Sequence, residues 1–323
     1  MSSNRSSDNP FLQQRELLAG QAAVLLEGRG VVTVTGPDRL TWVDSLTSQS
    51  MARLQPGESA ETLLLHPTGR IEHALRLVDD GETLWILADD AAPLAAFLDR
   101  MRFMLRVEVA DRSADFVTVG AFADIPDALA TWVDPWVASP GHGYGEPPTA
   151  PWAYREVVLA ASPALPLVPE AALDALRIAA HRPRQATEVD ERSIPHELDW
   201  LRSAVHLEKG CYRGQETVAK VHNLGHPPRR IVLLHLDGLL PPVGSPVLAG
   251  EAEIGVVTSA AQHHELGPIA LAVIKRSVDP AAQLTVRTEE DGDIAAAQEV
   301  IVPPDAGAVA NVPRLPRLGR VTR

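Results

Sequence analysis

The 323 residues carry 29 Lys and Arg against 42 Asp and Glu, and the formal net charge of −13 argues against general nucleic-acid binding, which needs a basic surface. Hydrophobic residues make up 45% of the chain, yet no apolar run is long enough to predict a transmembrane helix, and residues 1–20 lack the apolar core of a signal peptide. A single cysteine excludes an internal disulfide framework and favours a reducing compartment, so we expect a cytoplasmic protein without a membrane partner.

The first third of the chain predicts an α+β unit. After a polar segment over residues 1–19 that we expect to be flexible, residues 30–35 predict a strand, and Asp38 then predicts the cap of a helix. Tight turns follow between the next strands, which indicates an antiparallel meander. The remaining predicted elements are strands at 62–65, 71–78 and 83–87, a helix at 92–101 and a strand at 103–109.

The middle of the chain predicts a long loop over residues 134–152, because it is rich in proline and glycine. Gly141, Gly143 and Gly145 resemble a phosphate-binding fingerprint only superficially, since no strand enters the segment and no helix clearly leaves it. We therefore assign no phosphate site there. A helix is predicted next, over residues 171–180.

The C-terminal part predicts a small β-barrel over residues 227–303, because short strands recur there at nearly regular spacing. These strands are predicted at 231–236, 245–248, 253–258, 269–274, 283–287 and 299–302. Residues 304–323 are rich in proline and contain several arginines, which predicts a flexible basic tail; binding of an acidic partner is the alternative.

The segment from Lys209 to Glu216 holds the single cysteine, Cys211, between two cations and two glycines. Nearby cations and a following helix favour the thiolate form, so we expect Lys209 and Arg213 to activate Cys211. The surrounding residues 202–230 contain six Lys and Arg against two Glu, and this basic island suggests a local anionic ligand, with a solvated basic surface as the alternative.

Other chemical motifs are weak. The chain has neither a Gly-x-Ser-x-Gly elbow nor a P-loop, and the spacing of His222 and His226 and of the segment 263–265 is poor for a metal, so no metal site is predicted. Glu72 and His73 are a candidate acid and base. As consecutive residues of a strand they should point to opposite faces, which counts against joint action.

The eight residues 209–216 resemble the signature of YgfZ-type folate-binding proteins, which belong to the glycine-cleavage T-protein superfamily. Further similar segments spread the resemblance over residues 20–303. They are 34–40, 46–49, 68–73, 176–178 and 188–191, together with the predicted barrel.

The resemblance implies an α+β fold with three lobes in a ring, antiparallel sheets and a C-terminal β-barrel. Residues 20–226 would form the folate-binding, aminomethyltransferase-like region of two lobes, and tetrahydrofolate or a derivative would be the cofactor. Glu188 would bind the pterin, because a carboxylate can accept from the ring N–H and the amino group together. The other implied cofactor-binding residues are Arg177, Lys209, Gly210, Tyr212, Arg213, Gly214 and Gln215.

This sequence departs from the transferase pattern in three places. Glu72 and His73 stand near the position of an aspartate, Ala179 and His181 replace a glutamate and a glycine, and Gln215 stands where the transferase tends to carry a cation. The resemblance therefore favours a folate-binding accessory protein for assembly or repair of iron–sulfur proteins, including enzymes that modify tRNA, with Cys211 as a redox or partner thiol. The alternatives are a tetrahydrofolate-dependent one-carbon transferase that uses Glu72 or His73, and a non-catalytic interaction module.

Overall fold

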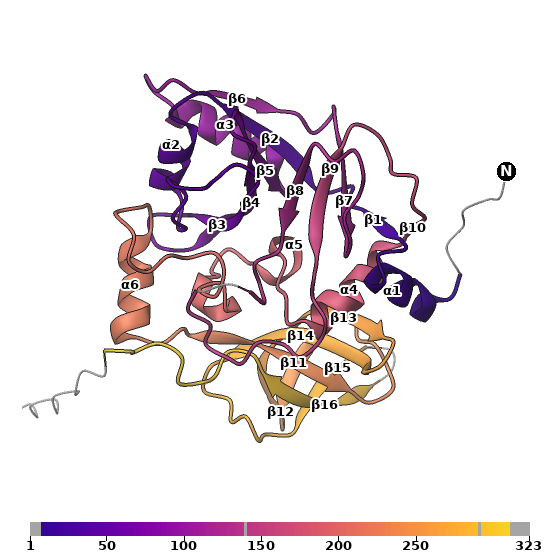
Figure 1. Cartoon of the computed structure of the whole chain (residues 1–323). Coiled ribbons are helices and arrows are strands. Elements are labelled where there is room, and N and C mark those ends of the chain that lie inside the picture. Colours follow the sequence, from indigo (N-terminus) through magenta and orange to yellow (C-terminus); the bar gives the residue numbers. More distant parts are fainter. Residues whose placement is uncertain (1–7, 139–140, 290–291, 311–323) are drawn as a thin grey trace, which may run out of the picture.

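Three lobes surround a central region of loops, as Figure 1 shows. The computed structural model describes residues 8–138, 141–289 and 292–310. Two five-stranded sheets form two lobes and a closed six-stranded barrel forms the third. The predicted α+β architecture with mainly antiparallel sheets and a C-terminal barrel is confirmed.

The first lobe is an antiparallel sheet covered on one face by two helices (Figure 1). Its strands, in order across the sheet, are β3 (Ser59–Leu65), β4 (Ile71–Asp79), β5 (Thr83–Ala88), β2 (Gly30–Thr35) and β6 (Glu108–Asp111). The helices are α2 (Arg39–Leu46) and α3 (Ala91–Met101). Alternate apolar residues of the strands pack with Val43 and Leu94 of these helices in one core.

Two predictions for this lobe need correction. Asp38 stands at the N-cap position of α2, but its side chain makes no capping hydrogen bond, and its carboxylate accepts instead from the Arg106 guanidinium at 2.6 and 3.1 Å. The strand expected at residues 103–109 begins only at Glu108. Phe103 has a φ of 46°, and it and Met104 are exposed, so the apolar residues that suggested a strand form a projecting turn.

The second lobe takes strands from distant parts of the chain. In order these are β10 (Leu167–Val168), β1 (Ala23–Leu25), β7 (Val117–Ala121), β9 (Arg155–Leu159) and β8 (Ala130–Val133). The pair β1–β10 is parallel and the other pairs are antiparallel. Because β1 lies here and β2 lies in the first lobe, the two lobes are interleaved in sequence. Helix α4 (Glu170–Ala179) then runs between this lobe and the barrel (Figure 1).

The N-terminal segment contains a helix, α1 (Pro10–Leu18), where the sequence predicted flexibility over residues 1–19. Asn9 caps the helix by accepting from the backbone N–H of Phe11 at 2.9 Å. Gln14 is buried and holds the distant turn between β13 (Ala252–His263) and β14 (Gly267–Lys275). It donates to the carbonyl of Gln262 at 2.8 Å and accepts from the N–H of His264 at 2.9 Å. The prediction is therefore corrected for residues 10–18.

The barrel closes through pairing of its first and last strands. Around the barrel the strands are β11 (Arg229–Leu236), β14 (Gly267–Lys275), β13 (Ala252–His263), β12 (Pro246–Ala249), β15 (Leu284–Arg287) and β16 (Asp293–Val300). The last strand was predicted at residues 299–302 and starts six residues earlier. Its alternating small and polar residues give a weak strand signal, and pairing with β11 and β15 decides its position.

The start of the predicted tail is ordered against helix α6 (Gln215–Leu224). The N–H groups of Val309 and Ala310 donate to the carbonyls of His222 and Asn223 at 3.0 and 3.1 Å. This corrects the expected flexibility for residues 304–310, whereas the arginines of the tail lie outside the described residues. Over the described part of the chain, no helix is long and apolar enough to cross a membrane.

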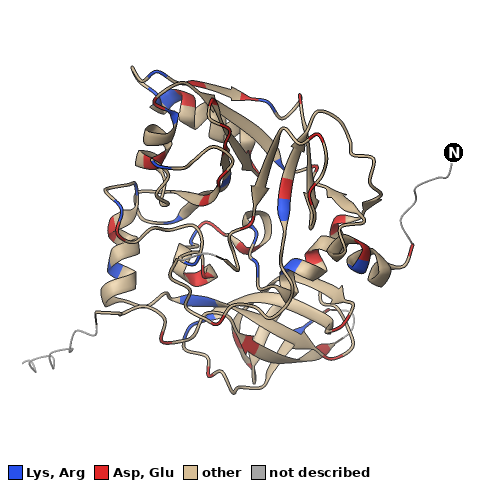
Figure 2. Cartoon of the chain, viewed as in Figure 1, with Lys and Arg blue, Asp and Glu red and all other residues tan. Residues whose placement is uncertain are grey.

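Positions of charged residues gather in the loops where the lobes converge, as Figure 2 shows. Arg182, which follows α4, donates to Glu61 of β3 at 2.6 Å and to Asp134, which follows β8, at 2.8 Å. All three side chains are buried. Ion pairs as well as apolar contacts therefore join the two sheet lobes.

Candidate functional site

The loop that carries Cys211 is held on the first lobe by Lys209. The Lys209 ammonium donates to the carbonyls of Asp44, Thr47 and Gln49 at 2.6, 2.9 and 2.8 Å, at the C-terminal end of α2. Carbonyls at the C-terminal end of a helix have no N–H partner within the helix, and a cation there also complements the helix dipole. Burial lowers the pKa of Lys209. Lys209 is thus an anchor for the loop.

Three further residues of the motif secure the loop at other points. The Arg213 guanidinium binds the Glu72 carboxylate at 2.8 and 3.2 Å and lies 5.5 Å from the centre of the Phe97 ring. Gly214 precedes α6 with a φ of 84°, and an added Cβ would meet the carbonyl oxygen of His66 at 2.7 Å, so glycine is required. The Gln215 amide donates back to the carbonyl of Lys209 at 3.1 Å.

Gly210 and Cys211 form the exposed part of the loop. Cys211 is a free, exposed thiol. A Cβ added to Gly210 would meet none of the described atoms within 4 Å, whereas Tyr212 is buried against the Lys209 ammonium. The loop therefore presents a single thiol on a rigid support. Lys209 and Arg213 were predicted to activate Cys211, but their charges are directed to α2 and to Glu72 instead.

The basic island predicted over residues 202–230 is not a free cationic surface. Arg229 binds Asp190 and Glu197, each through two of its nitrogens, at 2.6–3.0 Å. Arg202 pairs with Asp199 at 2.7 Å, and buried Arg230 donates to Gln298 at 2.7 Å. Most of these cations serve internal contacts, so the charge count in this segment does not indicate an anion site.

Glu188, the residue predicted to bind a pterin, is buried and has protein partners for both carboxylate oxygens. Oε2 accepts from the N–H of Arg184 at 2.7 Å, from the Thr187 hydroxyl at 2.7 Å and from Arg177 at 3.1 Å. Oε1 accepts from the Ser259 hydroxyl of the barrel. Arg177 and Glu188 are thus brought together in a contact between α4, α5 (Gln185–Glu188) and β13, in which each Glu188 oxygen already accepts from a protein group.

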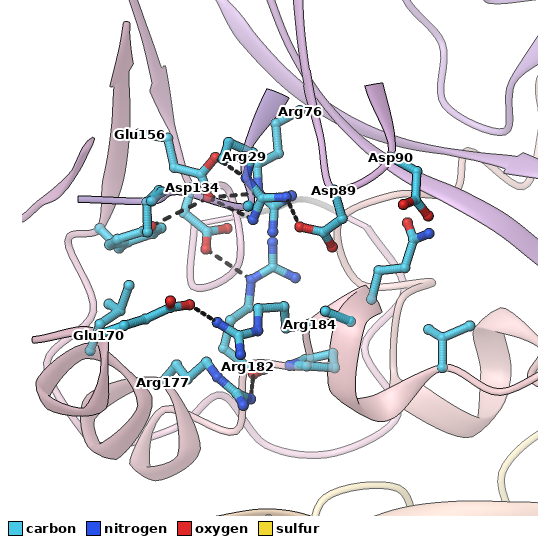
Figure 3. A pocket seen from close by; sticks show the side chains of 18 of the residues that line it. Arg29, Arg76, Asp89, Asp90, Asp134, Glu156, Glu170, Arg177, Arg182 and Arg184 are labelled. Atoms are coloured by element: carbon cyan, nitrogen blue, oxygen red, sulfur yellow. Dashed lines mark hydrogen bonds and ion pairs between the residues drawn. The ribbon is translucent and has the colours of Figure 1, made fainter. Parts of the chain in front are cut away.

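A cavity of about 500 Å³ lies beside this contact, between α4, α5, β4 and the loops of the second lobe (Figure 3). Aromatic and aliphatic side chains and a cluster of arginines and carboxylates line it. The apolar lining is Leu26, Trp152, Tyr154, Leu173, Pro183, Ala186 and Val189. The charged lining is Arg29, Arg76, Arg177, Arg182 and Arg184 with Asp89, Asp90, Asp134, Glu156 and Glu170. None of the lining residues belongs to the Cys211 loop, so the structure separates the predicted cofactor residues into two places.

Two smaller hollows of about 400 and 260 Å³ flank the Cys211 loop and share Leu207 and Glu208. His142 lines the first and His222 of α6 lines the second, and their rings meet edge to face with centres 4.7 Å apart. No local pattern in the sequence indicates this pair, because the two histidines are 80 residues apart in the chain.

Residues 141–145 form a strap across the centre of the molecule. A Cβ on Gly141 would lie 2.0 Å from the carbonyl oxygen of Arg202, and one on Gly145 would lie 2.1 Å from that of Ile301. The Tyr144 N–H donates to Asp199 at 2.7 Å. Glycine spacing here therefore permits close backbone packing.

The buried His196 below the strap makes stability depend on pH. Its Nε2 lies 3.1 Å from the Val218 carbonyl, Nδ1 has no partner among the described residues, and burial lowers the pKa to about 3. In the unfolded chain the pKa of a histidine is about 6.5. The stabilisation that neutral His196 contributes to the free energy of unfolding is therefore fully present above that pH and is lost as the pH falls toward 3. We expect the His196 contribution to fall by about 2 kcal/mol between pH 7 and pH 5.

Urea unfolding of the wild type and of His196→Gln at both pH values measures this loss. The glutamine retains an amide donor toward Val218 but does not titrate. The wild type should lose more stability than the variant on acidification, and equal losses would exclude His196 as the cause.

Glu72 and His73 do not form an acid–base pair. Glu72 is engaged by Arg213, and burial lowers the pKa of His73, which keeps that imidazole neutral at pH 7. Across the described ranges, no three His, Cys, Asp or Glu side chains are grouped to hold a metal ion.

Known proteins resemble this chain in sequence and in fold. A family model described as the glycine cleavage T-protein C-terminal barrel domain matches residues 229–304. An aminomethyltransferase from Moorella thermoacetica is 29% identical over 283 residues, which cover 76% of each protein. The mitochondrial iron-sulfur cluster assembly factor IBA57 homolog of Mycosarcoma maydis is 28% identical over 243 residues, 66% of this chain but only 57% of that protein.

The fold agrees with these matches. The crystal structure of the glycine cleavage system aminomethyltransferase T from Bartonella henselae superposes with a TM-score of 0.70, at 15% identity, over 94% of this chain and 92% of the other. In sequence and in fold, the chain therefore resembles the glycine-cleavage T-protein superfamily, as the sequence predicted. Within it, the resemblance to the YgfZ type, based on residues 209–216, is confirmed.

Proposed function

We propose that this protein is an accessory factor for assembly or repair of iron–sulfur proteins and that Cys211 contacts the partner or its cluster. The geometry of the loop carries the proposal. The side chains of Lys209, Arg213 and Gln215 all form hydrogen bonds that hold the loop in place, and the loop exposes the thiol of Cys211. The name of the Mycosarcoma maydis relative supports the same role.

A single thiol limits what the protein can do with a cluster. Protein-bound iron–sulfur clusters usually have four cysteine ligands, and this chain has one cysteine. Any cluster at Cys211 would therefore be cargo whose remaining ligands come from a partner. We expect the contact to be transient, to occur in a reducing compartment such as the cytoplasm, and to serve clients that include tRNA-modifying enzymes.

Replacing Cys211 with alanine should abolish rescue of iron–sulfur enzyme activity in cells that lack the protein. Because the side chain is exposed, the free energy of unfolding should change by less than about 0.5 kcal/mol. The measurement is the activity of an iron–sulfur enzyme in the rescued cells, with protein levels matched by immunoblot. Lys220→Ala, at an exposed position of α6, is the control and should rescue fully. Full rescue by Cys211→Ala would falsify the thiol role.

Binding of tetrahydrofolate or a derivative is the second part of the proposal. The resemblance to folate-binding proteins supports it, and so does a cavity within the usual size range for small-molecule sites. Both carboxylate oxygens of Glu188 already accept hydrogen bonds from protein groups, so we expect other side chains to bind the ligand. Titration with tetrahydrofolate should raise the melting temperature, because a ligand that prefers the folded state stabilises it. Absence of any shift would favour a non-catalytic interaction module without folate.

A further inference from the structure

The 500 Å³ cavity holds more hydrogen-bond donors than the protein satisfies. Arg76 and Arg182 are buried, with 6% and 4% of their surface exposed, and in each Nη1 has no partner in the described part of the protein. Nε of Arg184 is likewise buried and unpaired within the described residues. An arginine has five N–H donors and no acceptor, so these groups can be satisfied only by an acceptor from outside.

The carboxylates of the cavity do not supply that acceptor, because most of them already bind arginines. Glu156 pairs with Arg29 at 2.8 Å and with Arg76 at 3.0 Å, and Asp89 also pairs with Arg29. Asp134 accepts from Arg182 and from the Trp152 indole at 2.8 Å. The lining charges are balanced in number. Among the described lining atoms that are buried without a hydrogen bond, five are arginine nitrogens and two are carboxylate oxygens, of Asp89 and Glu156, so the unmet hydrogen bonds are mainly on the arginines.

The arrangement in space concentrates these donors. Figure 3 shows Arg29 and Arg76 entering the cavity from one side and Arg182 and Arg184 from the other. Arg184 is the most accessible of the unpaired set, with 19% of its side chain exposed, and its pair with Glu170 lies toward the solvent, since Glu170 is 45% exposed. A ligand that enters by this route would meet Arg184 first.

We propose that this cavity is a binding site for a small organic anion whose carboxylate or phosphate oxygens accept the hydrogen bonds that Arg76, Arg182 and Arg184 leave unmade. Charge-assisted bonds of this kind are the strong ones, and the planar guanidinium matches both groups. The ring or chain of the anion would lie against Trp152, Tyr154 and Leu173. The site is separate from Cys211. Because the proposed function uses the same cavity for tetrahydrofolate, this inference deepens that proposal and rests on it, whereas the phosphate titration tests the anion site without a folate.

The first experiment places a charge at the edge of the cavity without touching a buried group. Ala186 lines the cavity and is exposed, so both Ala186→Glu and Ala186→Gln should fold. The two side chains have the same size and differ in charge. The glutamate should weaken anion binding about tenfold relative to the glutamine, because a like charge would lie next to the bound oxyanion.

The second pair of variants tests the donors directly. Arg184→Gln removes the accessible guanidinium, and Arg155→Gln removes a surface guanidinium of similar exposure, 18%, that pairs with Asp124 and does not line the cavity. We expect Arg184→Gln to weaken binding tenfold to a hundredfold, within the range for a lost charged hydrogen bond, and Arg155→Gln to bind as the wild type does.

The probes are inorganic phosphate and 4-aminobenzoylglutamate, an aromatic dicarboxylate that forms the tail half of folate. Each is titrated by calorimetry and by melting temperature against potassium chloride of the same ionic strength. Binding of only one probe supports the site and identifies the group that it takes. Binding of neither to the wild type, or equal binding by Ala186→Glu and Ala186→Gln, overturns the proposal. The role of Cys211 is tested separately, by the rescue of iron–sulfur enzyme activity, so failure of the anion site and failure of the thiol role can be told apart.

Discussion

Replacing Arg182 with methionine should lower the free energy of unfolding by about 3–5 kcal/mol, the usual cost of removing one partner from a buried ion pair. Arg182 lies between Glu61 at 2.6 Å and Asp134 at 2.8 Å, and its guanidinium also lies 4.8 Å from the centre of the Trp136 ring. Methionine has a similar length but leaves both carboxylates buried without a cation. Since these carboxylates belong to different sheet lobes, the loss should appear as one cooperative destabilisation in urea.

Two further variants show whether charge or packing is responsible. Adding Glu61→Gln to Arg182→Met should recover part of the loss, because one uncompensated charge is removed. Arg287→Met, which breaks an exposed pair with Asp293, should cost no more than about 1 kcal/mol. A loss of that small size for Arg182→Met would mean that water solvates the two carboxylates and that the pair does not join the lobes.

Replacing Lys209 with methionine should cost about 2–4 kcal/mol, because three carbonyls lose a charged donor and only 4% of the side chain is exposed. The variant should also release the Cys211 loop. Hydrogen exchange should then rise for the first turn of α6, which begins at Gln215 and is tied to Lys209 through its own side chain.

Lys220→Met serves as the control, because Lys220 is exposed on the same helix. Its unfolding free energy and exchange pattern should match the wild type within about 0.5 kcal/mol. If Lys209→Met exchanged normally in α6, the loop would be held by Arg213 and Gly214 alone, and the anchoring role of Lys209 would be withdrawn.

Local patterns were sufficient for most of the elements. The strand predicted at residues 30–35 coincides with β2, and the meander was recognisable because turn residues separate its strands. The failures arose where distant contacts decide the structure. Helix α1 has only nine residues, and its position depends on contacts between Gln14 and residues 262–264. The last barrel strand depends on its pairing with β11.

For the site, the sequence identified the right loop but not the role of its charges. The partners of Lys209 and Arg213 are more than 140 residues away in the chain, at Thr47 and Glu72, and no local spacing indicates them. The same holds for Glu188, whose oxygens are taken partly by Ser259 of the barrel. No local pattern in the sequence indicates the anion cavity either, because its arginines come from segments that are far apart in the chain and that separately look like ordinary strands and turns.

The contact between Gln14 and the β13–β14 turn has a consequence for the order of folding during synthesis. Helix α1 is translated well before the barrel, yet the backbone groups that Gln14 binds are those of residues 262 and 264. Strand β1 likewise cannot form its parallel pair until β10, at residues 167–168, has been translated. Contacts over such distances in sequence form late, because the intervening chain must first be ordered. We therefore expect helix α1 to dock only after the barrel is nearly complete. In chains truncated within the barrel before residue 262, helix α1 should lack these contacts of Gln14.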